Sequence, residues 1–152
     1  MARKIKIRSV ASIRIVEQLA LFVDNRVGVL ATICDTLMQE RIHIYALSMS
    51  DTIDHAVVRM VVSDSRRALA IFESYGMLVF ESDVLMIECG DSRVSLPKIM
   101  KSLAEKKVNI EYCYLASLPV AEKNLMILRV QPLKKAMRFL QDFFKKPNHY
   151  GL

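Results

Sequence analysis

The chain has 152 residues, of which 53% are hydrophobic and 25% are charged, and its formal net charge is +6 at neutral pH. A chain of this length and apolar content is expected to fold as one domain or two small ones. The sequence holds no run of about 20 apolar residues, so we expect no membrane-spanning helix. No signal-peptide pattern follows its basic start either.

Cysteine and histidine usage indicates neither a disulfide framework nor a metal centre. The three cysteines lack metal-site spacing, and the three histidines share no ligand spacing. These residues are Cys34, Cys89, Cys113, His43, His55 and His149. We therefore expect a reducing, cytoplasmic setting, and no metal or other cofactor.

Positive charge is concentrated at the N-terminus, where residues 1–16 carry five of the 22 basic groups and no acidic one. A nucleic-acid binder spreads its charge over a groove or helix face, and residues 55–62 offer no aromatic platform for a base. We therefore expect no nucleic-acid partner. Residues 4–10 alternate isoleucine with basic residues, as a solvated edge strand does. We interpret residues 1–14 as a basic arm with an extra edge strand; the alternative is a frayed arm.

The first structured elements follow directly. Apolar residues alternate on one face over residues 19–23, which predicts a strand. A turn at residues 24–28 leads into a helix over 29–41, whose apolar residues recur at i, i+3 and i+4 and form one stripe. Alternation resumes at residues 42–46, which predicts a second strand.

The next segment completes a unit of the order strand, helix, strand, strand, helix, strand. Residues 50–54 have turn chemistry, and the continuous β-branched segment 55–62 is typical of a central strand. Asp64 or Ser63 is expected to cap the following helix. Residues 77–80 predict a short fourth strand.

The sequence then repeats at an offset of 66 residues, which places residues 17–48 on residues 83–114. A longer hairpin in the second copy aligns Arg59 with Arg129. The chain therefore divides into units at 15–81 and 82–152. The second unit ends after its second helix, so its fourth strand is missing. We expect residues 4–10 to supply that strand, in this chain or in a partner.

Two such units predict an α+β protein. Each unit is a ferredoxin-like βαββαβ fold with an antiparallel sheet and both helices on one face, because right-handed crossovers place the helices on the same side. One unit alone has a thin core and unprotected sheet edges, so we expect the two to pack together.

Several motifs resemble the ACT domain. They are the Asn-x-x-Gly-x-Leu turn at residues 25–30, the amphipathic helix after it, and the Ile-x-Ile segment at 42–44. Residues 46–52 and 109–112 are similar to the small freestanding two-ACT proteins of bacteria. The resemblance covers about residues 17–140. It implies a non-catalytic regulatory protein that binds an amino acid or similar ligand at an interface between units.

The physics of the first turn fits that implication. A turn that feeds a helix exposes unpaired N–H groups at the positive end of the helix dipole, which suits a carboxylate. Gly28 would allow close backbone approach, and Asp24 or the facing strand would accept an ammonium group. The predicted ligand-binding residues are Asp24, Asn25, Arg26, Val27, Gly28, Val29, Leu30, Ser48, Asp51 and Thr52. The second copy has Val94 in place of Gly28, so we expect the first copy to be the better ligand loop.

Two pairs of residues leave alternatives open. Arg59 and Arg129 either pair with an acid across the sheet or line the interface between units. Tyr112 and Tyr114 share one face of a strand, where they either wall a ligand pocket or cover that interface.

The leading interpretation is a sensor without catalytic activity. Its main rival is a structural assembly module that has lost ligand binding. An acylphosphatase-like enzyme using Arg93 or Arg26 with Asn109 is a further alternative, although the glycine-rich phosphate cradle is absent. We expect a homodimer, because of the exposed edges, and an unidentified regulated enzyme as partner, but no membrane.

Overall fold

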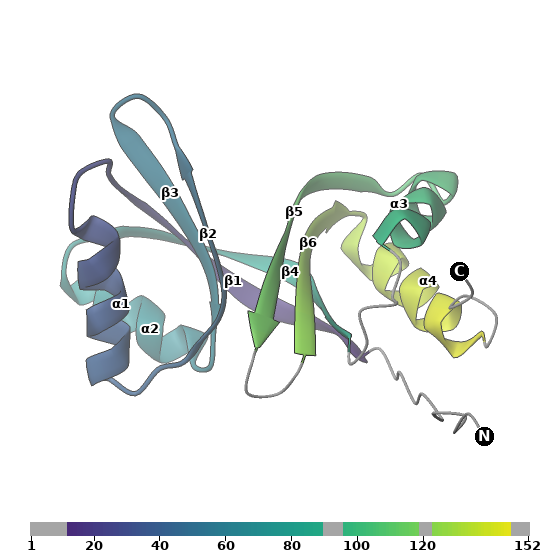
Figure 1. Cartoon of the computed structure of the whole chain (residues 1–152), viewed down its shortest axis with the longest axis horizontal. Coiled ribbons are helices and arrows are strands. Elements are labelled where there is room, and N and C mark those ends of the chain that lie inside the picture. The colour runs from purple at the N-terminus through teal and green to yellow at the C-terminus, as the bar shows by residue number, and fades with distance from the viewer. Residues whose placement is uncertain (1–11, 90–95, 119–122, 147–152) are drawn as a thin grey trace, which may run out of the picture.

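The computed structural model describes residues 12–89, 96–118 and 123–146 (Figure 1). Its strands and helices, in chain order, are β1 (Ser12–Asp24), α1 (Val29–Gln39), β2 (Ile44–Asp51), β3 (His55–Val62), α2 (Ser65–Ser74), β4 (Leu78–Cys89), α3 (Leu96–Glu105), β5 (Asn109–Leu118), β6 (Lys123–Gln131) and α4 (Leu133–Lys145). This order confirms the α+β class with two ferredoxin-like units. Among the described helices, none has the length and apolar content to cross a membrane.

The described strands form one antiparallel sheet of six strands in the order β2-β3-β1-β4-β6-β5. The two central strands, β1 and β4, pair along nearly their whole length, from Ser12 opposite Glu88 to Phe22 opposite Leu78. Each of them serves both units. Residues 19–24 of β1 pair with β3 of the first hairpin, residues 85–89 of β4 pair with β6 of the second, and among the described strands the remaining half of each pairs only with the other central strand. The expected boundary between residues 81 and 82 therefore falls inside the unbroken strand β4.

The second unit does have a fourth strand. Residues 12–16, at the start of β1, pair with residues 84–88 of β4 on the side away from β6. This is the position of the strand that the sequence lacks after its last helix. The segment expected to fill it, residues 4–10, lies outside the described residues. The N-terminal half of β1 takes that position within the same chain.

A local two-fold axis passes between β1 and β4. Glu17 lies opposite Asp83 in the ladder, and Asp83 is also the residue 66 positions after Glu17. That offset relates the two copies of the repeat, so the paired residues occupy the same place in their units. An antiparallel pair of equivalent residues can only lie on an axis that exchanges the two units.

All four helices lie on the same face of the shared sheet. Successive strand residues point to opposite faces, and the odd-numbered residues of β1 contact both helical layers: Ile13 packs in the core of the second unit and Leu19 in that of the first. The largest fully buried side chains include Leu19, Leu21, Ile33, Leu37, Met60, Phe72, Leu85, Ile87, Ile99 and Leu103. This arrangement confirms the predicted placement of the helices.

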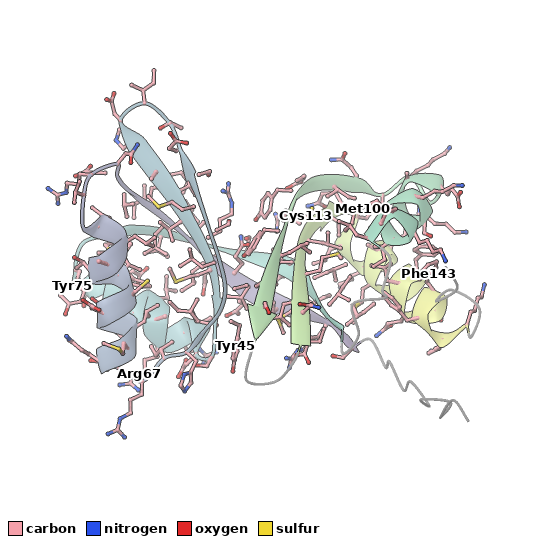
Figure 2. All side chains as sticks on the ribbon, in the orientation of Figure 1. Tyr45, Arg67, Tyr75, Met100, Cys113 and Phe143 are labelled. Atoms are coloured by element: carbon pink, nitrogen blue, oxygen red, sulfur yellow. The ribbon has the colours of Figure 1, made fainter. Side chains whose placement is uncertain are left out.

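The sheet is curved. The face that lies away from the helices therefore packs against itself between the two units. Figure 1 shows α1 and α2 at one end of the molecule, α3 and α4 at the other, and the two hairpins between them. Side chains of the β2–β3 hairpin and of the β5–β6 hairpin lie between the two units (Figure 2). The buried apolar residues of this inter-unit seam are Ala46, Val61, Val84, Met86, Leu125 and Ile127.

Local geometry repeats as well as topology. The edge strand of each unit has a register shift at the same place, beside Tyr45 in β2 and beside Glu111 in β5. After the first helix of each unit comes a non-glycine residue with positive φ, Arg41 at 56° and Lys107 at 57°. Asp64 caps α2 as expected, its side chain accepting from the Arg67 N–H at 3.0 Å.

The predicted equivalence of Arg59 and Arg129 is wrong. In the first unit Leu19 lies opposite Met60, and in the second the equivalent Leu85 lies opposite Leu128. Met60 and Leu128 are 68 residues apart, so the residue equivalent to Arg59 is Ile127. The register of the sheet, rather than residue identity, fixes the correspondence.

A candidate ligand groove beside the β1–α1 turn

The turn between β1 and α1, residues 25–28, is exposed and ends in a glycine. Gly28 is the N-cap of α1, with φ 89°, in the left-handed region. A Cβ added there would meet no atom within 4 Å. The backbone angle rather than crowding therefore makes glycine the suitable residue, since L-residues are strained in this region.

The N-terminus of α1 is left open to an anion. No side chain caps this helix and its first turn carries no acidic residue, within the described part of the chain. The turn is instead held by backbone bonds: Arg26 N–H donates to the Asp24 carbonyl at 3.0 Å, and Asn25 N–H donates to the Asp54 carbonyl at 3.3 Å. The positive end of the helix dipole is thus fixed in place without a bound acid.

An open groove of about 520 Å³ lies beside this turn. It is lined by Phe22, Val23, Asp24, Arg26, Val29, His55, Gly76, Met77 and Leu78. Its floor combines apolar side chains with two opposite charges, Asp24 and Arg26, whose Oδ2 and Nε atoms are 3.9 Å apart and largely exposed. A small zwitterion with an apolar side chain matches this lining.

The structure gathers only part of the predicted residue set in the groove. Asp24, Arg26 and Val29 line it, whereas Val27 is fully exposed and Leu30 packs against the first core. Asn25 lies in the turn between Asp24 and Arg26. The groove also draws on β3 and on the segment from Gly76 to Leu78, which the sequence did not suggest. That segment is brought in by the pairing of Phe22 with Leu78.

The predicted residues of the β2–β3 hairpin have other positions. Thr52 closes the hairpin turn, with its N–H and Oγ1 donating to the His55 carbonyl at 2.8 and 3.1 Å. Asp51 is exposed at the end of β2. Ser48 lies opposite Arg59, on the face that meets the second unit rather than in the groove.

The turn that corresponds to this one in the second unit, residues 91–95, lies outside the described residues, and Arg93 is part of it.

A second groove of about 440 Å³ lies beside α1 and is lined by Cys34, Met38, Arg41, Ile42, His43 and Ile44. Burial raises the pKa of the Cys34 thiol and Asp35 adds to the rise, so this thiol is poorly suited to nucleophilic attack. Within the described residues, no three metal-binding side chains converge.

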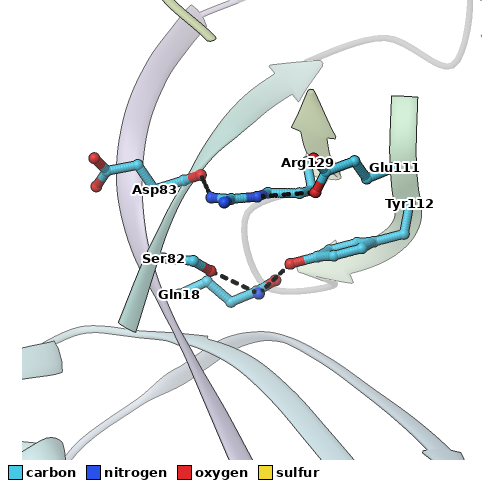
Figure 3. Close-up of polar contacts among 6 residues, drawn as sticks. All are labelled: Gln18, Ser82, Asp83, Glu111, Tyr112 and Arg129. Atoms are coloured by element: carbon cyan, nitrogen blue, oxygen red, sulfur yellow. Dashed lines mark hydrogen bonds and ion pairs between the residues drawn. The ribbon is translucent and has the colours of Figure 1, made fainter. Parts of the chain in front are cut away.

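A buried amide organises the polar part of the inter-unit seam (Figure 3). Gln18 of β1 is fully buried. Its Nε2 donates to the Tyr112 hydroxyl at 2.6 Å and to Ser82 Oγ at 3.4 Å, and its Oε1 accepts from the Tyr114 hydroxyl at 2.9 Å. The two tyrosines therefore cover the interface between units, and burial raises the pKa of Tyr114.

Of the two roles considered for Arg59 and Arg129, an ion pair across the sheet and a place at the interface between units, each arginine has one. Arg129 pairs with an acid across the sheet: its Nε donates to Glu111 at 3.2 Å, and its Nη1 donates to the Asp83 carbonyl at 2.7 Å (Figure 3). Arg59 lines the interface, with its guanidinium 4.7 Å from the centre of the Tyr112 ring. Its hydrogen bond goes to the neutral Ser50 hydroxyl, at 3.2 Å.

The fold and the groove define a class: a tandem pair of ferredoxin-like units with an open glycine turn at the first helix of one unit. The family model for the ACT domain pair matches residues 14–142, so the chain belongs to this family. This match confirms the predicted resemblance to the ACT domain. Because ACT domains are regulatory modules, membership of the family supports a small-molecule regulatory role. Among proteins of curated function, none matches the chain.

Solved structures agree with the assignment. Protein BT0572 from Bacteroides thetaiotaomicron is 25% identical, with a TM-score of 0.77 over 86% of this chain and 90% of that chain. The regulatory subunit of aspartate kinase from Thermus thermophilus is 14% identical, with a TM-score of 0.64 over 87% of this chain and 95% of that chain. The corresponding subunit from Thermus flavus is 17% identical, with a TM-score of 0.59 over 88% and 96%. At these identities the aspartate kinase subunits show the shared fold alone.

Proposed function

We propose that this protein is a non-catalytic sensor that binds a free amino acid in the groove beside the β1–α1 turn. The observation that carries the proposal is the uncapped N-terminus of α1, which begins after Gly28. It lies beside a groove that is also lined by Asp24. The helix N-terminus and Arg26 would receive the α-carboxylate. Asp24 would receive the ammonium group.

The lining also restricts the ligand side chain. Phe22, Val29, Met77 and Leu78 supply an apolar wall, which favours an aliphatic or aromatic amino acid over a strongly charged one. The regulatory role of the ACT family supports this function. An enzyme that pairs Arg26 with Asn109 has less support, because Asn109 begins β5 in the other unit and does not line the groove.

Binding at the turn would bear on how the two units are oriented. The turn is the end of β1, the strand whose other half belongs to the second unit and whose Gln18 joins β4 and β5. A ligand that prefers one orientation of the units shifts the population toward it. The output would pass to a separate regulated enzyme in the cytoplasm, from a protein that acts as a homodimer.

The test is calorimetry on the full chain against the twenty amino acids, with Asp24→Asn as the variant. We expect micromolar affinity for one amino acid, and an affinity loss of at least about tenfold in D24N, or about 1.4 kcal/mol. Asp142→Asn is the matched control, since Asp142 is an exposed acid on α4 with a surface ion pair to Lys145. No binding by the wild type would favour the assembly module, and full affinity in D24N would place the ligand elsewhere.

A further inference from the structure

Three large apolar side chains are exposed together on the first unit. Phe22, Leu78 and Phe80 are 42%, 57% and 54% exposed. Leu78 lies opposite Phe22 in the β1–β4 ladder and Phe80 lies two residues along. The two phenylalanine rings stack edge to face at 5.4 Å. We call these three residues the unit-1 patch.

Exposure of this kind needs an explanation. Single apolar residues at a surface are ordinary, but neighbouring ones on rigid strands mark an interaction site. The unit-1 patch lies on the face of the sheet away from the helices, since its members have the parity of Gln18 and Met86 rather than that of Leu19 and Leu85. None of the described helices lies on that face.

The second unit is an internal control for the requirements of the fold. The 66-residue offset places Glu88 where the first unit has Phe22, Ser12 in place of Leu78 and Arg14 in place of Phe80. Arg14 and Glu88 form an ion pair. The same three positions are therefore polar in one unit and apolar in the other, so folding does not require the apolar residues of the unit-1 patch.

Continuity with the inter-unit seam indicates what covers the patch. Along the same face of β1 and β4, the pair Gln18 and Ser82 follows directly after Phe80 and begins the seam. There, this face of the first unit is already covered by the equivalent face of an ACT unit. A second copy of the chain has the same face of the sheet, with the same three apolar residues exposed on it.

We propose that the unit-1 patch is the contact surface of a homodimer, in which Phe22, Leu78 and Phe80 pack against the same residues of a second copy around a two-fold axis. Such a contact is closed, so it yields a dimer rather than a filament. Phe22 and Leu78 also line the candidate groove. The partner would thus add a wall to a groove that is open in the single chain.

The contact itself does not depend on the proposed function; only the added wall does. The test is sedimentation velocity of the full chain at increasing concentration, for wild type, Phe80→Glu and Leu115→Glu. Leu115 is the matched control, because it is an apolar strand residue that is 61% exposed on β5, outside the patch. We expect a wild-type dimer that L115E retains and F80E weakens at least tenfold, as for a central interface residue.

Hydrogen exchange on the wild type locates the contact without any variant. Amides of residues 78–81 are expected to gain protection as concentration rises, whereas those of the edge strand β2 are not. The proposal is overturned by a wild type that stays monomeric, by an F80E dimer as tight as wild type, or by equal weakening in L115E. It is also overturned if protection rises at β2 or β5 instead of at residues 78–81. Amino-acid binding by a monomer would leave the proposed amino-acid site standing while this proposal fails.

Discussion

Arg59 of the first unit lies over the ring of Tyr112 of the second, with 4.7 Å between the guanidinium carbon and the ring centre. The same tyrosine receives a hydrogen bond from buried Gln18. Tyr112 thus contacts the first unit through both its ring and its hydroxyl. These polar contacts add to the shared β1–β4 ladder and to the buried apolar seam, which together hold the two units in one orientation.

Removing the cation–π contact is expected to reduce stability modestly. In a double-mutant cycle of Arg59→Met and Tyr112→Leu, we expect a coupling energy of about 0.5–1 kcal/mol, the range for partly exposed pairs. Urea unfolding of the four proteins measures it. Additive effects of the two substitutions would show that the ring and the guanidinium do not interact.

The buried amide is expected to contribute more. Gln18→Leu keeps the side-chain volume but leaves the Tyr114 hydroxyl without its acceptor, which should cost about 1–3 kcal/mol. Combining Q18L with Tyr114→Phe should recover part of the loss, because both partners are then apolar. Gln39→Leu, at an exposed position of α1, is the control and should change the free energy of unfolding little. A Q18L protein as stable as wild type would contradict the hydrogen bonds described for Gln18.

Alkaline pH provides an independent test of the seam. Burial raises the pKa of Tyr114 above the ordinary tyrosine value, electrostatic interaction with Tyr112 adds to the rise, and Arg59 opposes it. The unfolded chain therefore loses this proton near pH ~10 while the folded chain keeps it. The contribution of Tyr114 to stability is complete below that pH and is lost as pH rises toward the folded-state pKa. Chemical denaturation from pH 8 to 11 should show a steeper fall for wild type than for Tyr114→Phe; parallel curves would contradict this.

The left-handed residues after the helices predict opposite effects for two substitutions. Lys107 adopts φ 57° without being glycine, so Lys107→Gly should stabilise the protein by about 0.5–1 kcal/mol through relief of strain. Gly76 has φ 73° with no atom near an added Cβ, so Gly76→Ala should destabilise it by about 1 kcal/mol through backbone strain alone. Thermal unfolding of both variants measures the signs; equal signs would contradict the assignment.

Local patterns predicted most of the individual elements. The β-branched run at 55–62 was expected as a central strand, and β3 has these bounds. The helix expected from residue 29 begins there as α1, and Asp64 caps α2. These features depend on residues close in sequence, so alternation, helical spacing and capping chemistry are sufficient to indicate them.

The long-range features could not be predicted in this way. The 66-residue repeat placed a boundary between residues 81 and 82, but β4 runs through this point, because it pairs with β1 on both sides of the two-fold axis. The pairing of Arg59 with Arg129 followed residue identity, whereas the correspondence depends on hairpin length and register. The groove takes Gly76, Met77 and Leu78 from a strand start about fifty residues beyond the turn, and only the sheet order brings these together.

The most direct test of the amino-acid site is a titration of the ¹⁵N-labelled full chain, followed through its backbone amide resonances. An amino acid bound in the groove should shift the amides of residues 25–31 first, together with those of His55 and of residues 76–78. Shifts confined to the groove beside Cys34 or to the inter-unit seam, or no shift with any of the twenty amino acids, would contradict the account.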